Sequence, residues 1–227
     1  MKNLLLVFVL ASITRGGDAQ NCASFYLLQN NKTVTFAVYN KRGNPNGSII
    51  YKISAIPAKS NVTTATVHTN LLDKEGKSVN KGVSNVKCNN GTVMIDMNLF
   101  LPQQQTEQFN KTHARVKDAF LEYPALMEAG NQLKDGIFNM EIDNNGLKQI
   151  LKMQIFNRKV GETEKISTEA GTWDCLAISY QVKLDIQTGP IAIPLTYHAT
   201  EWYAPGLGIV KTVSEAGSTE IVSIKQG

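Results

Sequence analysis

Apolar and polar residues alternate along most of the chain, which is the pattern of a β-strand with one buried face. In the segment Lys32–Tyr39, for example, Val34, Phe36 and Val38 fall on one face of the strand. Clusters of Asn, Gly and Asp separate such segments, and these residues favour the tight turns of hairpins. The segment Gly189–Pro194 is predicted to be a turn region as well. The strands predicted in this way cover residues 32–39, 48–56, 63–71, 83–88, 92–97, 136–142, 147–158, 162–167, 173–185, 195–203, 208–214 and 219–225, with a further extended piece from residue 121.

The number and order of these strands predict the fold class. Roughly 11 to 13 strands follow one another through short turns, and sequential hairpins imply antiparallel pairing. The Gln-rich segment Pro102–Ala119 interrupts them, and Pro102 stands where a short surface helix would start. We therefore predict a mainly β protein, a large curved antiparallel sheet or open half-barrel meander with one or two short helices. Residues 20–227 would form a single β-rich domain, whose two halves meet near residues 102–135.

The N-terminus has the features of a cleaved signal peptide. A lysine near the start precedes the apolar stretch Leu4–Ile13, and Gly17 and Ala19 occupy the −3 and −1 positions of a small-x-small cleavage site. The apolar stretch is too short to span a bilayer, which takes about 20 residues. We therefore predict that residues 1–19 form the signal peptide and are removed on export.

The sequence next to the cleavage site bears on anchoring. A lipid-modified cysteine is preceded by a small residue, whereas Asn21 precedes Cys22. No later segment reaches the roughly 18 consecutive apolar residues of a transmembrane helix. We therefore predict an exported protein without a lipid anchor or a membrane span, in the periplasm or outside the cell.

Three cysteines remain in the exported chain, Cys22, Cys88 and Cys175. An oxidising compartment favours one disulfide and leaves one thiol, and the sequence allows three pairings. Cys22 and Cys88 lie in polar surroundings, while Cys175 lies in a stretch that is typical of a core strand. We favour the pair Cys22–Cys88, which would tie down the N-terminus.

Charge and histidine content give no indication of a nucleic-acid or metal partner. The 23 basic and 19 acidic residues are spread along the chain without a block of five like charges, as on a solvated surface. His68, His113 and His198 have no second His or Cys at metal-ligand spacing, so no cofactor is predicted. Cys175 with His198 is the one nucleophile and base that we considered, but a thiol in a core strand is commonly inert. No catalytic residue is predicted.

The segment Glu201–Gly208 allows two interpretations. Trp202 and Tyr203 could form an aromatic lip beside a ligand cavity, or they could fill the core at a tight corner between two strands. Pro205 and Gly206 begin a Pro-Gly-x-Gly sequence, which is turn chemistry and favours the corner.

Several short motifs occur in one order and spacing that resembles a known family. They are Cys22–Tyr26, Asp73–Lys77, Val86–Cys88, Met94–Met97, Ala170–Cys175, Ile178–Tyr180 and Glu201–Lys211. Together they resemble the TapB-like family of exported proteins from Gram-negative Bacteroidota, which is related to a DUF3108-like bacterial domain of unknown function. The resemblance covers essentially the whole mature chain. It implies a β-rich periplasmic or surface protein without an established enzymatic activity, whose fold is similar to the half-barrels that hold acyl chains in lipoprotein carriers.

These observations lead to three functional hypotheses. The first is a non-enzymatic envelope protein that binds an apolar small molecule or lipid on the concave face of the sheet. The second is a structural or accessory envelope component whose exposed edge strands pair with a protein partner. The third is a hydrolase that acts through Cys175 or through a dispersed site. The first is our preferred prediction.

Overall fold

The structure is a computed structural model that describes residues 22–59, 62–101, 115–116, 119–144 and 147–227, so that the predicted signal peptide lies outside the described residues. Within these ranges the chain forms a 13-stranded sheet. Its strands are β1 (Lys32–Asn40), β2 (Pro45–Lys59), β3 (Val62–Leu72), β4 (Ser78–Asn89), β5 (Thr92–Asp96), β6 (Arg115–Val116), β7 (Phe120–Tyr123), β8 (Gly136–Asn144), β9 (Leu147–Thr168), β10 (Gly171–Thr188), β11 (Ile191–Ala204), β12 (Gly208–Ser214) and β13 (Gly217–Gln226).

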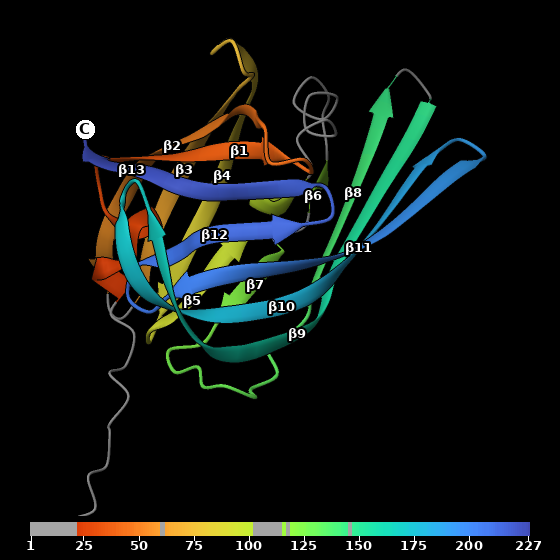
Figure 1. The fold of residues 1–227 in the computed structure, drawn as a ribbon. Helices are drawn as coiled ribbons and strands as arrows, with labels where there is room; N and C mark the ends of the chain where they lie inside the picture. The colour runs from red at the N-terminus through yellow and green to blue at the C-terminus, as the bar shows by residue number, and fades with distance from the viewer. Residues whose placement is uncertain (1–21, 60–61, 102–114, 117–118, 145–146) are drawn as a thin grey trace, which may run out of the picture.

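The sheet is an antiparallel meander that curls on itself. Its strand order is β6-β8-β9-β10-β11-β12-β13-β1-β2-β3-β4-β5-β7, and the meander continues from the last strand to the first because β13 pairs with β1. The sheet curves into a nearly closed barrel, with β7 and β8 approaching across the remaining gap (Figure 1). The predicted fold class, a mainly β meander in a large curved sheet, is confirmed.

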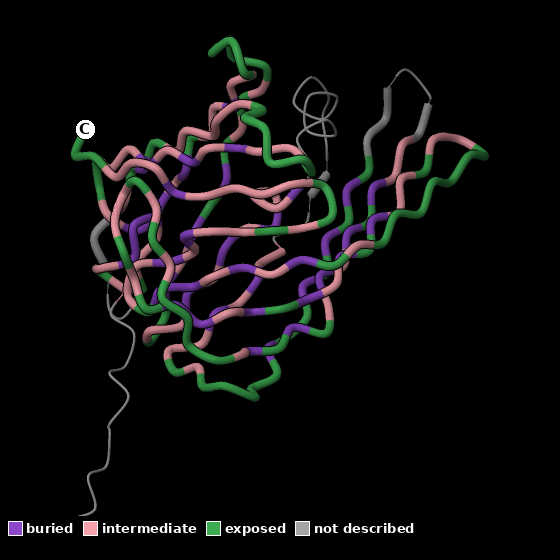
Figure 2. The backbone as a smooth tube through the Cα atoms, in the orientation of Figure 1, coloured by how far each residue is buried: buried purple, intermediate pink, exposed green. Residues whose placement is uncertain are grey.

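The apolar and polar residues that alternate in the sequence point alternately into the barrel and out of it. In β1 the side chains of Val34, Phe36 and Val38 are buried and their neighbours are more exposed. The same alternation of buried and exposed positions recurs along most strands in the body of the barrel (Figure 2). Both sides of the candidate boundary near residues 102–135 contribute strands to this one sheet.

A short N-terminal plug, residues 22–28, closes one end of the barrel. It consists of the 3₁₀ turns η1 (Cys22–Ser24) and η2 (Tyr26–Leu28). Residues 25–28 are at most 4% exposed, and the backbone N–H of Tyr26 donates to the carbonyl of Leu207 at 3.0 Å. A disulfide joins Cys22 to Cys88 on β4, which is the predicted pairing. The plug is therefore held by a covalent bond on one side of the barrel and by hydrogen bonds on the other.

The long hairpins β8–β9 and β10–β11 project beyond the other end of the barrel (Figure 1). The sequence predicted a turn over Gly189–Pro194, and this prediction was wrong because β11 already begins at Ile191. The N–H of His198 faces away from β10, since it donates to Oε1 of Glu215 at 3.2 Å. Alternate residues of a strand point the same way, so Pro194 lacks an N–H only on the outer edge. The strand therefore continues through the proline without losing a ladder hydrogen bond.

One further expectation differs from the structure, and another is largely untested. Residues 147–158 and 162–167 were predicted as separate strands, but they form the single strand β9 with two register irregularities against β10. The Gln-rich segment for which a helix was predicted lies largely outside the described residues, and its residues 115–116 form β6. The helical elements of the described ranges are η1, η2 and a third 3₁₀ turn, η3 (Met97–Phe100). None of them is long and apolar enough to cross a membrane.

Candidate functional site

The interior of the barrel contains a cavity of about 270 Å³. It is bounded by residues from the plug, from β1 and β2, from β5 and the adjoining η3 turn, and from β9 to β13. The lining residues are Tyr26, Leu27, Phe36, Ile49, Tyr51, Ile95, Leu99, Phe100, Leu101, Ile155, Tyr180, Val182, Tyr197, Ala199, Ile209, Thr212, Ser214 and Thr219. Strands far apart in the sequence thus build one largely apolar surface around the cavity.

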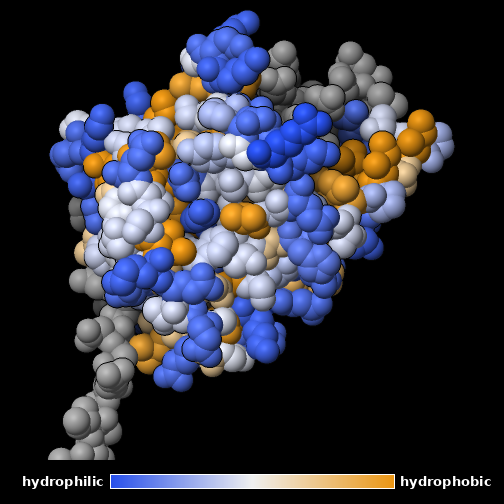
Figure 3. Space-filling view, viewed as in Figure 1, coloured by the Kyte–Doolittle hydropathy of each residue, from blue (hydrophilic) through white to orange (hydrophobic). Residues whose placement is uncertain are grey.

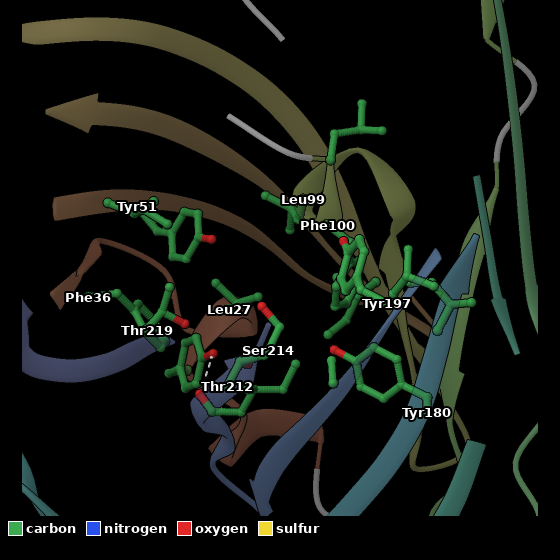
Figure 4. A pocket seen from close by; sticks show the side chains of 18 residues that line it. Leu27, Phe36, Tyr51, Leu99, Phe100, Tyr180, Tyr197, Thr212, Ser214 and Thr219 are labelled. Atoms are coloured by element: carbon green, nitrogen blue, oxygen red, sulfur yellow. Dashed lines mark hydrogen bonds between the residues drawn. The ribbon is translucent and has the colours of Figure 1, made fainter. Parts of the chain in front are cut away.

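Aromatic side chains keep the cavity open as a rigid frame. The rings of Phe36 and Tyr51 meet edge to face with centroids 5.7 Å apart, and Tyr26 lies 6.2 Å from Phe36. Leu27 of the plug also contributes to the lining, and Tyr180 and Tyr197 face the same space from β10 and β11 (Figure 4). Because the hydroxyl of Tyr26 donates to the carbonyl of Ile209 at 2.9 Å, this ring is fixed at both ends. These contacts fix the position of the Tyr26 ring in the cavity wall.

The cavity continues into a wider mouth at the end of the barrel opposite the plug. The mouth has a volume of about 550 Å³ and shares Tyr197, Thr212, Ser214 and Thr219 with the cavity. Its other residues come from the end of β1, the start of β2, the first half of β11, the β12–β13 turn and the start of β13. Ligand pockets commonly measure about 300 to 1,000 Å³. The cavity and its mouth together are in the range that holds a small molecule.

Apolar side chains extend from the mouth along the projecting β10–β11 hairpin. Ile191, Ile193 and Leu195, which we call the apolar lip, are 63%, 59% and 49% exposed. Leu195 lies directly opposite the buried Leu184, and opposite residues of an antiparallel pair project to the same face. The lip is thus the inner face of the sheet, continued beyond the barrel. Figure 3 shows hydrophobic surface gathered along this projection.

A buried ion pair lies deeper in the barrel, in the direction of the plug. Glu201 on β11 and Arg158 on β9 are both fully buried, with 3.9 Å between Nη2 of the arginine and Oε1 of the glutamate. The hydroxyl of Tyr123 donates to the same oxygen at 2.8 Å. The guanidinium also lies over the ring of Tyr123, 4.8 Å from its centroid. Charge, hydrogen bond and ring together hold these three strands in one arrangement.

Arg158 also bridges the gap in the barrel, which we call the seam, at the point where β9 continues past the end of its pairing with β8. Its Nη1 donates to the backbone carbonyls of Glu122 and Lys134, at 2.9 Å each. Residues 130–133 pair with β9 beside it, through the N–H of Leu133 to the carbonyl of Arg158 at 2.9 Å and the N–H of Val160 to that of Asn131 at 2.9 Å. The arginine therefore replaces a strand-to-strand ladder with side-chain hydrogen bonds.

Stacked rings connect the seam to the plug. Tyr123 stacks on Tyr203 at 5.0 Å, Tyr203 faces Phe25 at 6.4 Å, and Phe25 stacks on Tyr26 at 5.3 Å. Tyr26 in turn lines the cavity. The cavity thus rests on a continuous aromatic support.

The environment of Glu201 changes its protonation. Burial raises the pKa of this carboxyl from 4.5 to about 7, while the guanidinium of Arg158 and the hydroxyls of Tyr123 and Tyr180 lower it in part. The pKa of Tyr180 is raised well above 10, mainly by burial and secondly by the negative charge of Glu201. The pair therefore has a proton that titrates near neutral pH, next to a tyrosine that lines the cavity.

The corner residues predicted from the sequence lie at the plugged end. Tyr203 is fully buried in the ring stack, and the indole N–H of Trp202 donates to Oε2 of Glu164 at 2.8 Å. Pro205 and Gly206 lie in the turn before β12, where Gly206 has a φ of +78°. These four residues do not belong to the described lining of the cavity or its mouth.

The structure separates the two residues of the hydrolase hypothesis. Cys175 is buried, and burial raises the pKa of its thiol to about 11. In the β10–β11 register His198 pairs with Gln181, six positions along β10 from Cys175, which corresponds to roughly 20 Å. Its ring contacts Gln181 and Glu215 instead. Among the described residues no three His, Cys, Asp or Glu side chains gather as metal ligands would.

Sequence reasoning missed the buried pair and most of the cavity lining. Glu201 lies on the same face of β11 as Tyr197 and Ala199, four and two residues earlier, so the alternation of the sequence already indicated that this glutamate points inward. Arg158 gave no such signal. Asn157 before it has a positive φ of 54°, and the irregularity at this point turns the arginine inward.

The chain is similar in fold to two solved structures and matches one protein family. A "putative lipoprotein" from Parabacteroides distasonis has the same fold, with a TM-score of 0.73 and 21% sequence identity over 91% of this chain and 100% of the other. A "putative exported protein with YmcC-like fold" from Bacteroides fragilis gives a TM-score of 0.70 and 21% identity over 91% and 99% of the two chains. No curated protein sequence matches. The DUF3108-like family matches residues 29–225, and the chain therefore belongs to the DUF3108-like family.

Proposed function

We propose that the protein is an exported, non-enzymatic binding protein of the cell envelope that holds an apolar, lipid-like ligand inside its barrel. The observation that supports this most directly is the cavity of about 270 Å³ with its wider mouth. Its deeper lining is almost entirely aliphatic and aromatic, as in pockets that bind by burial of apolar surface. The signal-peptide pattern of residues 1–19 and the description of the B. fragilis structure as an exported protein support the envelope location.

The shape of the site favours a ligand with one long apolar part. The cavity is closed by the plug at one end and open at the mouth, so a molecule enters lengthwise from one side. Each CH₂ group that is buried contributes about 0.8 kcal/mol. A single acyl or alkyl chain fits this arrangement, because its affinity grows with the length that is buried.

The alternative of a partner that pairs with an edge strand receives less support. Residues 191–198 of β11 pair with β10 on one side only, so they form an edge. On that edge Pro194 lacks an N–H, and the N–H of His198 already donates to Glu215. Native edges use proline and charge in this way to prevent pairing with another chain.

Ala199 offers a test of the cavity. Its side chain is 6% exposed and lines the cavity, so that Ala199→Phe places a ring inside it. We expect the wild-type protein to bind the uncharged apolar dye Nile red with a rise in fluorescence, and Ala199→Phe to bind it at least about tenfold more weakly. The matched control is Thr200→Phe, because the next residue of the strand faces away from the barrel interior.

Two further measurements keep this test decisive. Circular dichroism and urea unfolding show whether Ala199→Phe is folded, since overpacking costs about 1 to 3 kcal/mol. Ser214→Trp narrows the mouth from a partly exposed position and is the second variant. Native mass spectrometry of protein purified from its host should find a bound lipid-like molecule. Absence of that molecule, or equal dye binding by both folded cavity variants and the wild type, would overturn the proposal.

A further inference from the structure

Four hydroxyl side chains, those of Tyr197, Thr212, Ser214 and Thr219, lie where the cavity opens, while the hydroxyls of Tyr26, Tyr51 and Tyr180 lie deeper. Thr212 on β12 and Thr219 on β13 are directly paired across the two strands, and both line the cavity and the mouth. Tyr197 contributes a further hydroxyl to the lining of the mouth, from β11 and from another side than the two threonines (Figure 4). The deeper lining consists mainly of aliphatic side chains and aromatic rings. An amphiphile would therefore lie with its chain in the cavity and its polar end among these hydroxyls.

Of the hydroxyls that line the mouth, those of Thr212, Thr219 and Tyr197 are neutral and available. Burial raises the pKa of Tyr197 above 10, and it raises the pKa of Tyr51 farther inside to about 12, so both are uncharged at neutral pH. Within the described part of the chain, no hydrogen bond is formed by the side-chain hydroxyl of Thr212, Thr219 or Tyr197. A hydroxyl donates one hydrogen bond and accepts up to two. The mouth thus offers donors and acceptors without a net charge.

The charged side chain at the mouth is an acid. Glu215 lines the mouth from the β12–β13 turn, and its Oε1 accepts from the backbone N–H and from the ring of His198. These hydrogen bonds, the backbone one first, lower the pKa of Glu215, so it is a carboxylate at neutral pH. An anionic head group would be repelled by this charge, and it would also lose its hydration among groups that do not neutralise it.

We infer that the ligand ends in an uncharged hydrogen-bonding group, a hydroxyl, ester or amide, and that Thr212, Thr219 and Tyr197 hold this group at the mouth. This inference rests on the proposed function, because it assigns the polar end of the same ligand. It separates neutral amphiphiles, such as monoacylglycerols, from free fatty acids and phosphorylated lipids that have the same chain.

The test compares two competitors with the same acyl chain, monopalmitoylglycerol and palmitate, for their ability to displace Nile red from the full chain at neutral pH. We expect monopalmitoylglycerol to bind at least about tenfold more tightly, because palmitate would bring its charge to the carboxylate of Glu215. Equal displacement by the two, or tighter binding of palmitate, overturns the inference and leaves the proposed function standing. If neither competitor displaces the dye and Ala199→Phe binds it as the wild type does, both proposals fail.

Two variants test the named side chains separately. Thr212→Val with Thr219→Val keeps the shape and removes two hydroxyls, and we expect monopalmitoylglycerol to bind about tenfold more weakly while Nile red binding changes little. Thr200→Val on the outer face of β11 is the control. Glu215→Lys places a cation at an exposed position of the mouth and should strengthen palmitate about tenfold without changing monopalmitoylglycerol. Unchanged affinities in both variants would overturn the assignment of these residues.

Discussion

The buried pair of Glu201 and Arg158 makes a quantitative prediction about stability and pH. The perturbation is Glu201→Gln, which keeps the size of the side chain and an oxygen that can accept from Tyr123 but removes the titrating group. The pKa of Glu201 rises from 4.5 in the unfolded chain to about 7 in the folded one, and burial is the largest cause of this shift. At about 1.4 kcal/mol for each pKa unit, this difference amounts to about 3 kcal/mol.

The sign follows from which state holds the proton. Between pH 4.5 and about 7 the folded protein keeps this proton while the unfolded chain has released it. Stability therefore falls as the pH rises through this window, and the contribution of Glu201 is constant below and above it. The free energy of unfolding of the wild type, minus that of Glu201→Gln, should decrease by about 3 kcal/mol from the acid to the neutral side of the window.

Urea unfolding followed by tryptophan fluorescence measures both proteins at intervals across this pH window. The subtraction cancels the titration of all other groups, so the change of the difference with pH is the result, not its absolute level. The absolute level also contains the difference in packing and hydrogen bonding between glutamine and the protonated glutamic acid, which does not change with pH. A difference that stays constant within about 1 kcal/mol across the window would refute the account of Glu201 as a buried, titrating carboxyl.

Two further predictions concern the plug. Replacing Cys22 and Cys88 together by alanine opens a loop with a sequence separation of 66, and we expect the free energy of unfolding to fall by about 4 kcal/mol; a urea midpoint equal to that of the wild type would contradict this role of the disulfide. In Gly208→Ala the new Cβ would lie 2.5 Å from Cε2 of Phe25, so we expect the free energy of unfolding to fall by about 2 to 4 kcal/mol in the same assay. The control is Gly189→Ala, because Gly189 also has a positive φ but has open space around it. We expect this control to lose about 1 kcal/mol. Equal losses in the two glycine variants would show that the contact with the plug is unimportant.

The fold followed from the sequence wherever a local pattern determined it. Period-2 alternation placed Val34, Phe36 and Val38 inside the barrel, because side chains on alternate positions of a strand share a face. The turn over Gly189–Pro194 was misplaced, because proline is a turn signal until one knows that its missing N–H lies on an outer edge. That depends on the neighbouring strands.

The site was less predictable for a physical reason. A cavity depends on which inward faces remain apart after the sheet has curled, and the residues that line it range from Tyr26 to Thr219. The seam depends on Arg158, whose inward direction results from an irregularity at Asn157 and not from the alternation of the strand. The aromatic corner at Trp202 and Tyr203 was visible in the sequence, but its position at the plugged end required the contact between Tyr26 and Leu207.

The geometry also separates the groups that stabilise the barrel from those that would bind a ligand. The disulfide of Cys22, the ring stack through Tyr203 and the seam at Arg158 all lie toward the plug or the gap, and none of these three residues belongs to the described lining of the cavity or mouth. The hydroxyls of Thr212 and Thr219 lie at the mouth. Sites far apart that share no partners contribute additively. Substitutions at the plug and seam should therefore change the free energy of unfolding with little change in affinity, whereas substitutions at the mouth should do the reverse. Tyr26 and Leu27 link the two groups, since they belong to the plug and also line the cavity.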